Sequence, residues 1–445
     1  MSGLEIGLIG FVVLLLLLAL RIPIGVAMLA VGMAGHATIL GTPAMLLSFL
    51  KTETYWQFTN ENLSVIPLFL LMGEFAAKAG LSAALFTAAN AWLGHHRGGI
   101  AMAAIGGCAG FGAIAGSSLA TAATMGQVAL PELRRFNYAG SLATGTLAAG
   151  GTLGILIPPS IVLIVYAVQV EANVATLFQA AFIPGLLAAL GYILAIAVVV
   201  RIDPAAGPAG DKLPLARRAQ ALVAIWPVLV IFLLVMGGIY GGVFTPTEGA
   251  GVGAVCTFLV AVFMGGMRWP GFVAALLGTA RTCGLIFLIV LGAAIFNAFL
   301  GFSELPNAAA DFFGGSGLSP YTILLGMLVL YIGLGMVMDS LSMIFLTTPI
   351  FWPIIAGLDF GIGDYGLNGE EVKLWFGVLT LIVVEMGLIT PPVGLNVFII
   401  NSIARDVPMI ETFRGVIPFI LSDIVRVALL IGAPVIILIL PQWLA

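Results

Sequence analysis

A few polar side chains lie within long apolar stretches of this sequence, and they are the first candidates for chemistry. Asp339 is followed by Ser340 and Ser342, and its other close neighbours are Met, Val and Leu. A carboxylate inside a membrane is costly and is by default a functional group that binds an ion or carries a proton. The alternative role is a structural ion pair with an arginine such as Arg281.

Hydroxyl side chains gather in residues 109–124, which read AGFGAIAGSSLATAAT. The small residues indicate close packing between membrane helices, and membrane hydroxyls often bond to a carbonyl of their own helix. Ser117 and Ser118 have another possible role, because polar groups at a helix break can coordinate a sodium ion. The expected hairpin context favours ion binding over packing alone.

Two Pro-Pro pairs interrupt apolar segments in the same way. Residues 154–159 read GILIPP, and residues 387–392 read GLITPP at an offset of 233. A proline inside a helix removes a backbone donor and breaks the helix. Lipid cannot satisfy the freed carbonyls, so each break must face protein or a water-filled cavity. Such breaks bind cations through carbonyls and anions through the next helix N-terminus.

Other charged residues allow narrower predictions. Glu385 precedes the second Pro-Pro pair and could support a cation site, bind a proton or cap the break. Asp423 and Arg426 are three positions apart, which predicts a local ion pair on one helix face. The run from Thr245 to Glu248 predicts a helix start with Thr247 as its cap.

Composition assigns the chain to a class. Of its 445 residues, 61% are hydrophobic and only 8% are charged, against about 25% charged in soluble proteins. The unbroken apolar stretches predict an all-α polytopic membrane protein rather than a β-barrel. A net charge of −4 predicts no nucleic-acid partner. Three scattered cysteines and three histidines offer no metal or catalytic cluster. We therefore expect neither an enzyme nor a cofactor.

The charged residues predict the topology. Basic residues at 95–97, 134–135 and 201–218 mark the cytoplasmic side, and acidic residues such as Asp359, Asp364 and Glu370 mark the outside. We predict ten full spans with both termini outside, the first being a retained helix rather than a signal peptide. Five spans in each half make the two halves inverted repeats. The predicted parts are a first repeat 1–200 with a re-entrant hairpin 98–131 and a broken helix 138–168, a cytoplasmic linker 201–219, and a second repeat 220–445 with a hairpin 320–358 and a broken helix 375–403.

Further matches support an internal duplication. Residues 116–119 (GSSL) align with residues 338–341 (MDSL), and residues 181–184 (AFIP) align with residues 415–418 (GVIP). Ordered matches at nearly constant offset are typical of repeats. We expect each hairpin tip to meet a helix break near the membrane midplane, which would make two related sites.

The motifs resemble those of one family. Residues 111–118 (FGAIAGSS), 148–160 (AAGGTLGILIPPS), 67–73 (PLFLLMG), 245–250 (TPTEGA) and 387–396 (GLITPPVGLN) are similar to the large membrane subunit of tripartite ATP-independent periplasmic (TRAP) transporters. The resemblance covers nearly the whole chain. It implies an elevator-type secondary transporter in the bacterial inner membrane, driven by sodium and importing a small carboxylate.

The resemblance also implies sites and partners. The sodium-site residues it implies are Ser117, Ser118, Gly154, Pro158, Gly335, Asp339, Ser340, Gly387, Thr390 and Pro391. Ser160 and Asn396 follow the breaks and are the implied substrate contacts. A periplasmic binding protein would deliver the substrate. No four-helix domain precedes the first motif, so a separate small four-helix membrane subunit is implied.

Other functions remain as alternatives. A one-component sodium–dicarboxylate or citrate symporter of related fold would need no binding protein. An intramembrane enzyme would need a paired acid and base or a metal cluster, and a passive scaffold would not need two helix breaks beside a buried Asp339. The sequence does not choose among C4-dicarboxylates, 2-oxo acids, sugar acids and sialic acids.

Overall fold

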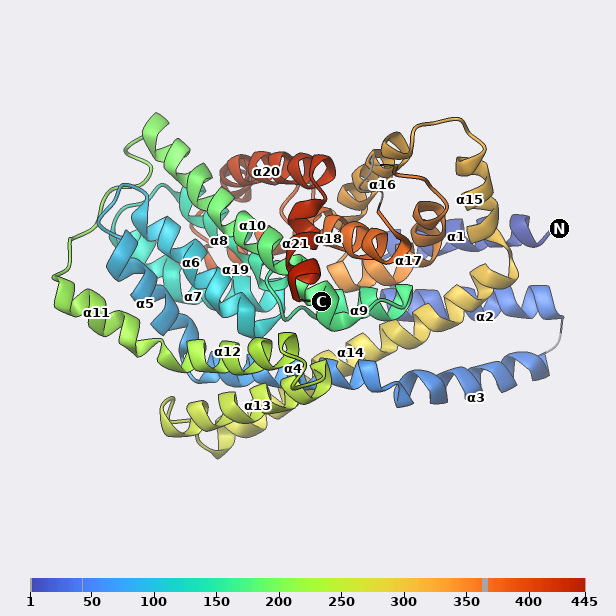
Figure 1. Ribbon diagram of the computed structural model, residues 1–445, viewed down its shortest axis with the longest axis horizontal. Helices are drawn as coiled ribbons and strands as arrows, with labels where there is room; N and C mark the ends of the chain where they lie inside the picture. The colour runs from blue at the N-terminus through green and yellow to red at the C-terminus, as the bar shows by residue number, and fades with distance from the viewer. Residues whose placement is uncertain (1, 42, 362–366, 445) are drawn as a thin grey trace.

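The computed structural model describes residues 2–41, 43–361 and 367–444, and every regular element in those ranges is an α-helix (Figure 1). Asp364, one of the acidic residues used for the topology, lies outside the described residues. The helices are α1 (Gly3–Ala19), α2 (Ile24–Leu40), α3 (Pro43–Thr59), α4 (Glu61–Lys78), α5 (Leu81–Leu93), α6 (Gly99–Ala115), α7 (Ser118–Arg135), α8 (Gly140–Leu156), α9 (Ile161–Val170), α10 (Val174–Ile202), α11 (Leu215–Ala224), α12 (Trp226–Tyr240), α13 (Pro246–Phe263), α14 (Trp269–Phe302), α15 (Leu305–Gly314), α16 (Pro320–Gly335), α17 (Ser340–Ala356), α18 (Gly369–Gly387), α19 (Leu395–Ile403), α20 (Met409–Gly432) and α21 (Val435–Leu444).

Local sequence explains several helix starts. Asn368 caps α18, and Glu371 bonds back to the Asn368 N–H, so both form a capping box. The start of α13 differs from the prediction, because Thr245 rather than Thr247 is the cap. Thr245 accepts a hydrogen bond from the Glu248 N–H at 3.2 Å, and the Glu248 carboxylate accepts one from the Thr245 N–H at 2.8 Å. Pro246 then occupies the first helical position, where its missing donor costs nothing.

The helices are long and apolar enough for a polytopic membrane protein. Four of them in the described chain, α10, α13, α14 and α20, could each cross a membrane by length and composition. Three bent pairs, α4–α5, α8–α9 and α11–α12, bring the total to seven if each pair is one span. The other three spans that we predicted correspond to α1, α2 and the α18–α19 pair. Helices α1 and α2 have only 17 residues each.

Helix boundaries differ from the predicted segments at several points. Helix α7 continues through Pro131 to Arg135, beyond the predicted hairpin end. Helix α3 had no counterpart in the prediction. The predicted linker 201–219 is helical at both of its ends, because α10 runs to Ile202 and α11 begins at Leu215. Residues 61–93 form two helices, α4 and α5, bent by 63°.

The two halves of the chain interleave around the helix breaks. Helix α9, which follows the first break, packs against α17 and α18 of the second half. Helix α19, which follows the second break, packs in return against α7 and α8 of the first half. The Tyr166 hydroxyl on α9 donates a hydrogen bond to the Lys373 carbonyl on α18 at 3.0 Å. The second part of each broken helix is therefore held in place by helices of the other half.

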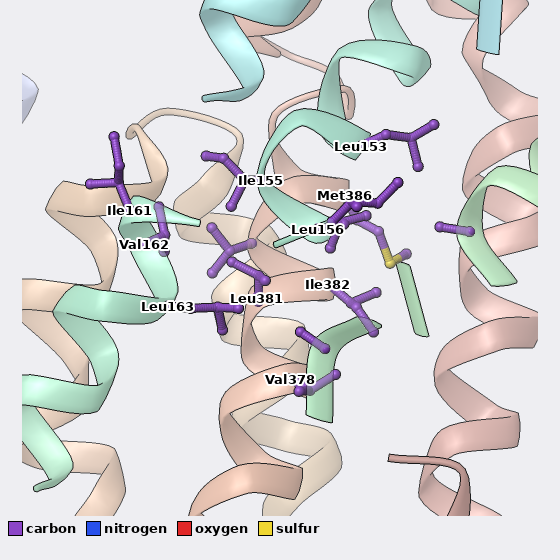
Figure 2. Close-up of a cluster of buried hydrophobic side chains, with 14 of the residues drawn as sticks. Leu153, Ile155, Leu156, Ile161, Val162, Leu163, Val378, Leu381, Ile382 and Met386 are labelled. Carbon is purple, nitrogen blue, oxygen red and sulfur yellow. The ribbon is translucent and has the colours of Figure 1, made fainter. Parts of the chain in front are cut away.

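A buried apolar cluster supports the first break (Figure 2). It joins side chains on both sides of the break to one face of α18, namely Leu153, Ile155, Leu156, Ile161, Val162, Leu163, Val378, Leu381, Ile382 and Met386. Burial of a leucine-sized side chain among protein neighbours adds many close contacts and makes the interior hard to deform. The cluster thus fixes the ends of α8 and α9 against the second half.

Candidate functional site

The first hairpin tip lies against the first helix break. Helix α6 ends at Ala115, and Ser117 caps α7 by accepting a hydrogen bond from the Ala120 N–H at 3.4 Å. A Cβ atom on Gly154 would lie 2.6 Å from the Ser117 carbonyl oxygen, so only glycine fits there. Gly116 has a φ of +61° and comes close to the Pro159 carbonyl. The structure therefore brings these first-half site residues together.

The second hairpin tip meets the second break through a glycine pair. A Cβ atom on Gly335 would lie 3.0 Å from the Gly387 Cα, and one on Gly387 would lie 2.6 Å from the Gly335 Cα. The Gly394 N–H, at the end of this break, donates a hydrogen bond to the Met336 carbonyl of the tip at 3.3 Å. The Thr390 hydroxyl bonds to the Met386 carbonyl at 2.6 Å. Gly335 and Gly387 of the second half therefore also adjoin each other.

The same kind of contact occurs in both halves. In the first half, a Cβ atom on Gly112 of α6 would lie 2.6 Å from the Gly154 Cα of α8. Gly335 of α16 and Gly387 of α18 repeat this glycine-on-glycine contact in the second half. Gly154 and Gly387 hold equivalent places before the two Pro-Pro pairs. Hairpin and broken helix thus approach each other through backbone in each half.

Asp339 is the N-cap of α17, at the position that Ser117 holds in α7. Its carboxylate accepts a hydrogen bond from the Ser342 N–H at 3.1 Å, and the Ser342 hydroxyl is a second donor. None of the ion pairs in the described ranges involves Asp339 or Arg281. The pair with Arg281 that we considered as an alternative is therefore not found.

Glu385 is hydrogen-bonded to the second hairpin tip. The Ser340 hydroxyl of the second tip donates a hydrogen bond to Glu385 Oε1 at 2.6 Å. Ser118, at the first tip, also lies close to this carboxyl group. Glu385 is only 1% exposed, and its Oε2 atom has no hydrogen-bond partner among the described residues. A buried polar atom without a partner is costly, which marks Glu385 as a candidate functional group.

The two breaks differ in exposure. Residues 157–160 of the first break are buried, whereas Pro391 and Pro392 of the second break are exposed. A cavity of about 520 Å³, here named the tip cavity, lies beside the second tip and break. Its lining includes Asp339, Ser342 and, from the α1–α2 connection, Arg21. A cation and a carboxylate therefore border the same space.

Ser160 and Asn396 do not line the tip cavity. Ser160 is fully buried and caps α9 by accepting a hydrogen bond from the Leu163 N–H at 3.4 Å. Asn396 is also fully buried, and its amide donates to the Ala148 carbonyl on α8 at 3.3 Å. Ser160 thus holds the start of its own helix, whereas Asn396 links α19 to α8 and keeps an Oδ1 atom without a partner among the described residues. Substrate contact by either stays a prediction.

The predicted pair of Asp423 and Arg426 is present and buried. Arg426 Nη2 lies 2.8 Å from Asp423 Oδ1, and the Tyr192 hydroxyl donates to Asp423 Oδ2 at 2.7 Å. Thr152 of α8 completes the group at 3.1 Å from the Tyr192 hydroxyl. This network joins α8, α10 and α20 just ahead of Gly154. Sequence spacing indicated the pair but not the tyrosine, which comes from another helix.

Interleaved halves, paired proline breaks and long apolar helices are the features of a membrane transport protein. The chain belongs to the DctM family of TRAP transporters, because residues 11–436 match the family described as "Tripartite ATP-independent periplasmic transporter, DctM component". This confirms the resemblance stated above. The chain is accordingly a transporter permease and not an enzyme.

Individual relatives agree with this assignment. The chain is 35% identical over 417 residues to the C4-dicarboxylate TRAP transporter large permease protein DctM of Pseudomonas aeruginosa, covering 93% of this chain and 94% of that protein. It is 27% identical over 430 residues to the sialic acid TRAP transporter large permease protein SiaM of Vibrio cholerae, covering 96% of each. Among solved structures, the YdaH transporter of Alcanivorax borkumensis has a similar fold, with a TM-score of 0.60 at 15% identity, covering 87% of this chain and 88% of that one.

Proposed function

We propose that this chain is the large permease subunit of a TRAP transporter that imports a small carboxylate, driven by a sodium gradient. A periplasmic binding protein delivers the substrate, and a separate small four-helix membrane subunit completes the membrane complex. The chain lies in the bacterial inner membrane with both termini in the periplasm. Family membership supports the transporter class; the ion, the substrate and the partners are proposals.

The observation that carries the proposal is that each hairpin tip meets the helix break of its own half, with Glu385 bonded to the second tip. Ser117 and Gly154 adjoin in one half, and Gly335 and Gly387 adjoin in the other. Carbonyls freed at breaks, together with hydroxyls and carboxylates of the tips, form oxygen-rich sites for sodium. The repeated contacts also support two inverted repeats, because glycines at matching positions make the same kind of backbone contact in each half.

The tip cavity and the relatives support one substrate class. Arg21 places a positive charge on a cavity of about 520 Å³ beside the second tip, and arginine is well suited to binding a carboxylate. The two relatives above are named for C4-dicarboxylates and sialic acid, and both of these ligands are carboxylates. We propose an organic acid of this kind as the substrate.

The interleaved packing supports an elevator mechanism. Helices α6–α9 and α16–α19 exchange segments across the two halves, so they cannot separate without breaking the cluster in Figure 2. We propose that these helices move as one body and carry the substrate past the remaining helices. The alternative, a one-component symporter of related fold, uses the same motion but needs no binding protein.

Uptake into proteoliposomes tests the function. The chain, reconstituted with the small subunit, should import a radiolabelled C4-dicarboxylate only with an inward sodium gradient and the loaded binding protein. Equal uptake with an inward potassium gradient would contradict sodium coupling. Full uptake without the binding protein would favour the one-component symporter instead.

A further inference from the structure

A second polar cavity lies away from the hairpin tips. It has a volume of about 330 Å³, is lined by residues of α3, α4, α9, α14 and α17, and is here named the seam cavity. In Figure 1, α3 and α4 lie on one side of α14, and α9 and α17 lie on the other. Its polar lining consists of Glu53 and Gln57 on α3, Gln169 on α9 and Asn297 on α14. None of the ten sodium-site residues implied by the family resemblance lines it.

Buried polar atoms in this lining lack partners. Both amide atoms of Gln169 and the Oδ1 atom of Asn297 are inaccessible and make no hydrogen bond within the described chain. Gln57, by contrast, donates to the Glu53 carboxylate at 2.8 Å. Buried amides without partners are rare in native proteins, and residues that line a cavity with such amides indicate a polar occupant. The seam cavity is therefore expected to hold water, an ion or a polar solute.

The charge of the lining selects among these occupants. Glu53 contributes a carboxylate, and the described residues that line the cavity include no Lys, Arg or His to balance it. A change of side-chain rotamer would turn an amide oxygen of Gln169 or Asn297 into the cavity. Hard cations take carboxylate, amide and water oxygens as ligands. The lining thus repels an anion and favours a hard cation.

We propose that the seam cavity is a cation-binding site, occupied by a sodium ion that Glu53, Gln169 and Asn297 coordinate with water. The site spans the boundary between the helices that we propose to move and those that remain. An ion there would stabilise one position of the moving helices relative to the remaining helices. The choice of sodium rests on the proposed function, whereas the oxygen-rich lining does not depend on it.

Equilibrium binding of ²²Na⁺ to the purified complex of this chain and its small subunit tests the proposal. Glu53→Gln, Gln169→Met and Asn297→Leu should each bind one ion fewer per complex than the unaltered protein at the same sodium concentration. Asn297→Asp, which adds a second charge, should instead bind sodium several-fold more tightly. Glu61→Gln is the matched control, because Glu61 is exposed at the start of α4 and does not line the cavity.

Each outcome has a defined meaning. If the three cavity variants bind as many ions as Glu61→Gln, the seam site is wrong. If they lose an ion while Asp339→Asn does not, the seam site stands and the hairpin-tip assignment fails. If only Asp339→Asn loses an ion, the reverse holds. Absence of saturable sodium binding in the unaltered complex would overturn both sites. A variant that elutes abnormally from size exclusion is set aside, and Asn297→Asp then decides the question.

Discussion

The Ser340 hydroxyl at the tip of the second hairpin donates a hydrogen bond of 2.6 Å to the buried carboxylate of Glu385. Glu385 belongs to α18, the helix that leads into the second Pro-Pro break, so this bond ties a hairpin tip to a broken helix. Ser118 of the other hairpin lies near the same carboxylate. Glu385 therefore bonds to one hairpin tip and lies near the other.

Removing the Ser340 hydroxyl should lower the stability of the folded protein. Ser340→Ala leaves Glu385 Oε1 without its donor, and an unsatisfied buried acceptor costs about 1–3 kcal/mol. We expect a lower midpoint of thermal unfolding for the purified complex and slower uptake. Ser402→Ala is the control, since Ser402 is exposed and bonds only to its own helix. Equal midpoints of thermal unfolding for both variants would show that the Ser340 hydrogen bond does not stabilise the fold.

Asp339→Asn should raise the sodium concentration needed for half-maximal uptake. Asparagine is as good an N-cap as aspartate, so the start of α17 should survive while the negative charge is lost. Sodium titrations in proteoliposomes at fixed substrate measure the effect, and we expect a shift of about tenfold, since a weakening of about 1.4 kcal/mol corresponds to that factor. An unchanged sodium dependence would remove Asp339 from the proposed site.

Gly387→Ala should abolish uptake. Its Cβ atom would lie 2.6 Å from the Gly335 Cα, and backbone cannot yield as a flexible side chain can, so the tip and the break must move apart. Gly284→Ala on α14 is the matched control, because nothing lies within 4 Å of its added Cβ. The control should be neutral or more stable by up to about 1 kcal/mol. Normal uptake by Gly387→Ala would contradict the close contact.

Cysteine labelling checks the topology. In a background without Cys108, Cys256 and Cys283, a cysteine at Glu370 should react with a membrane-impermeant maleimide added outside intact cells. A cysteine at Arg217 should react only after the cells are opened. Both positions are exposed in the fold, so a difference in labelling reports the side of the membrane rather than burial. The opposite pattern would reverse the predicted orientation.

The sequence by itself determined the class of the protein and the order of its parts. Scarce charge and long apolar stretches allow only a helical membrane protein. The two Pro-Pro pairs mark the breaks because proline cannot continue a helix, whatever surrounds it. The i, i+3 spacing of Asp423 and Arg426 was enough to predict their pair, since helix geometry alone brings them together. These features depend on residues that are close in the sequence, so the sequence alone predicts them.

Tertiary structure alone decided which distant groups meet. Nothing in the spacing of Ser340 and Glu385 indicates a bond, because they lie on separate helices 45 positions apart. The exchange of α9 and α19 between the halves, and the gathering of Glu53, Gln169 and Asn297 around the seam cavity, depend on how helices pack across long sequence distances. Packing is set by the fit of whole surfaces, and no single motif encodes it.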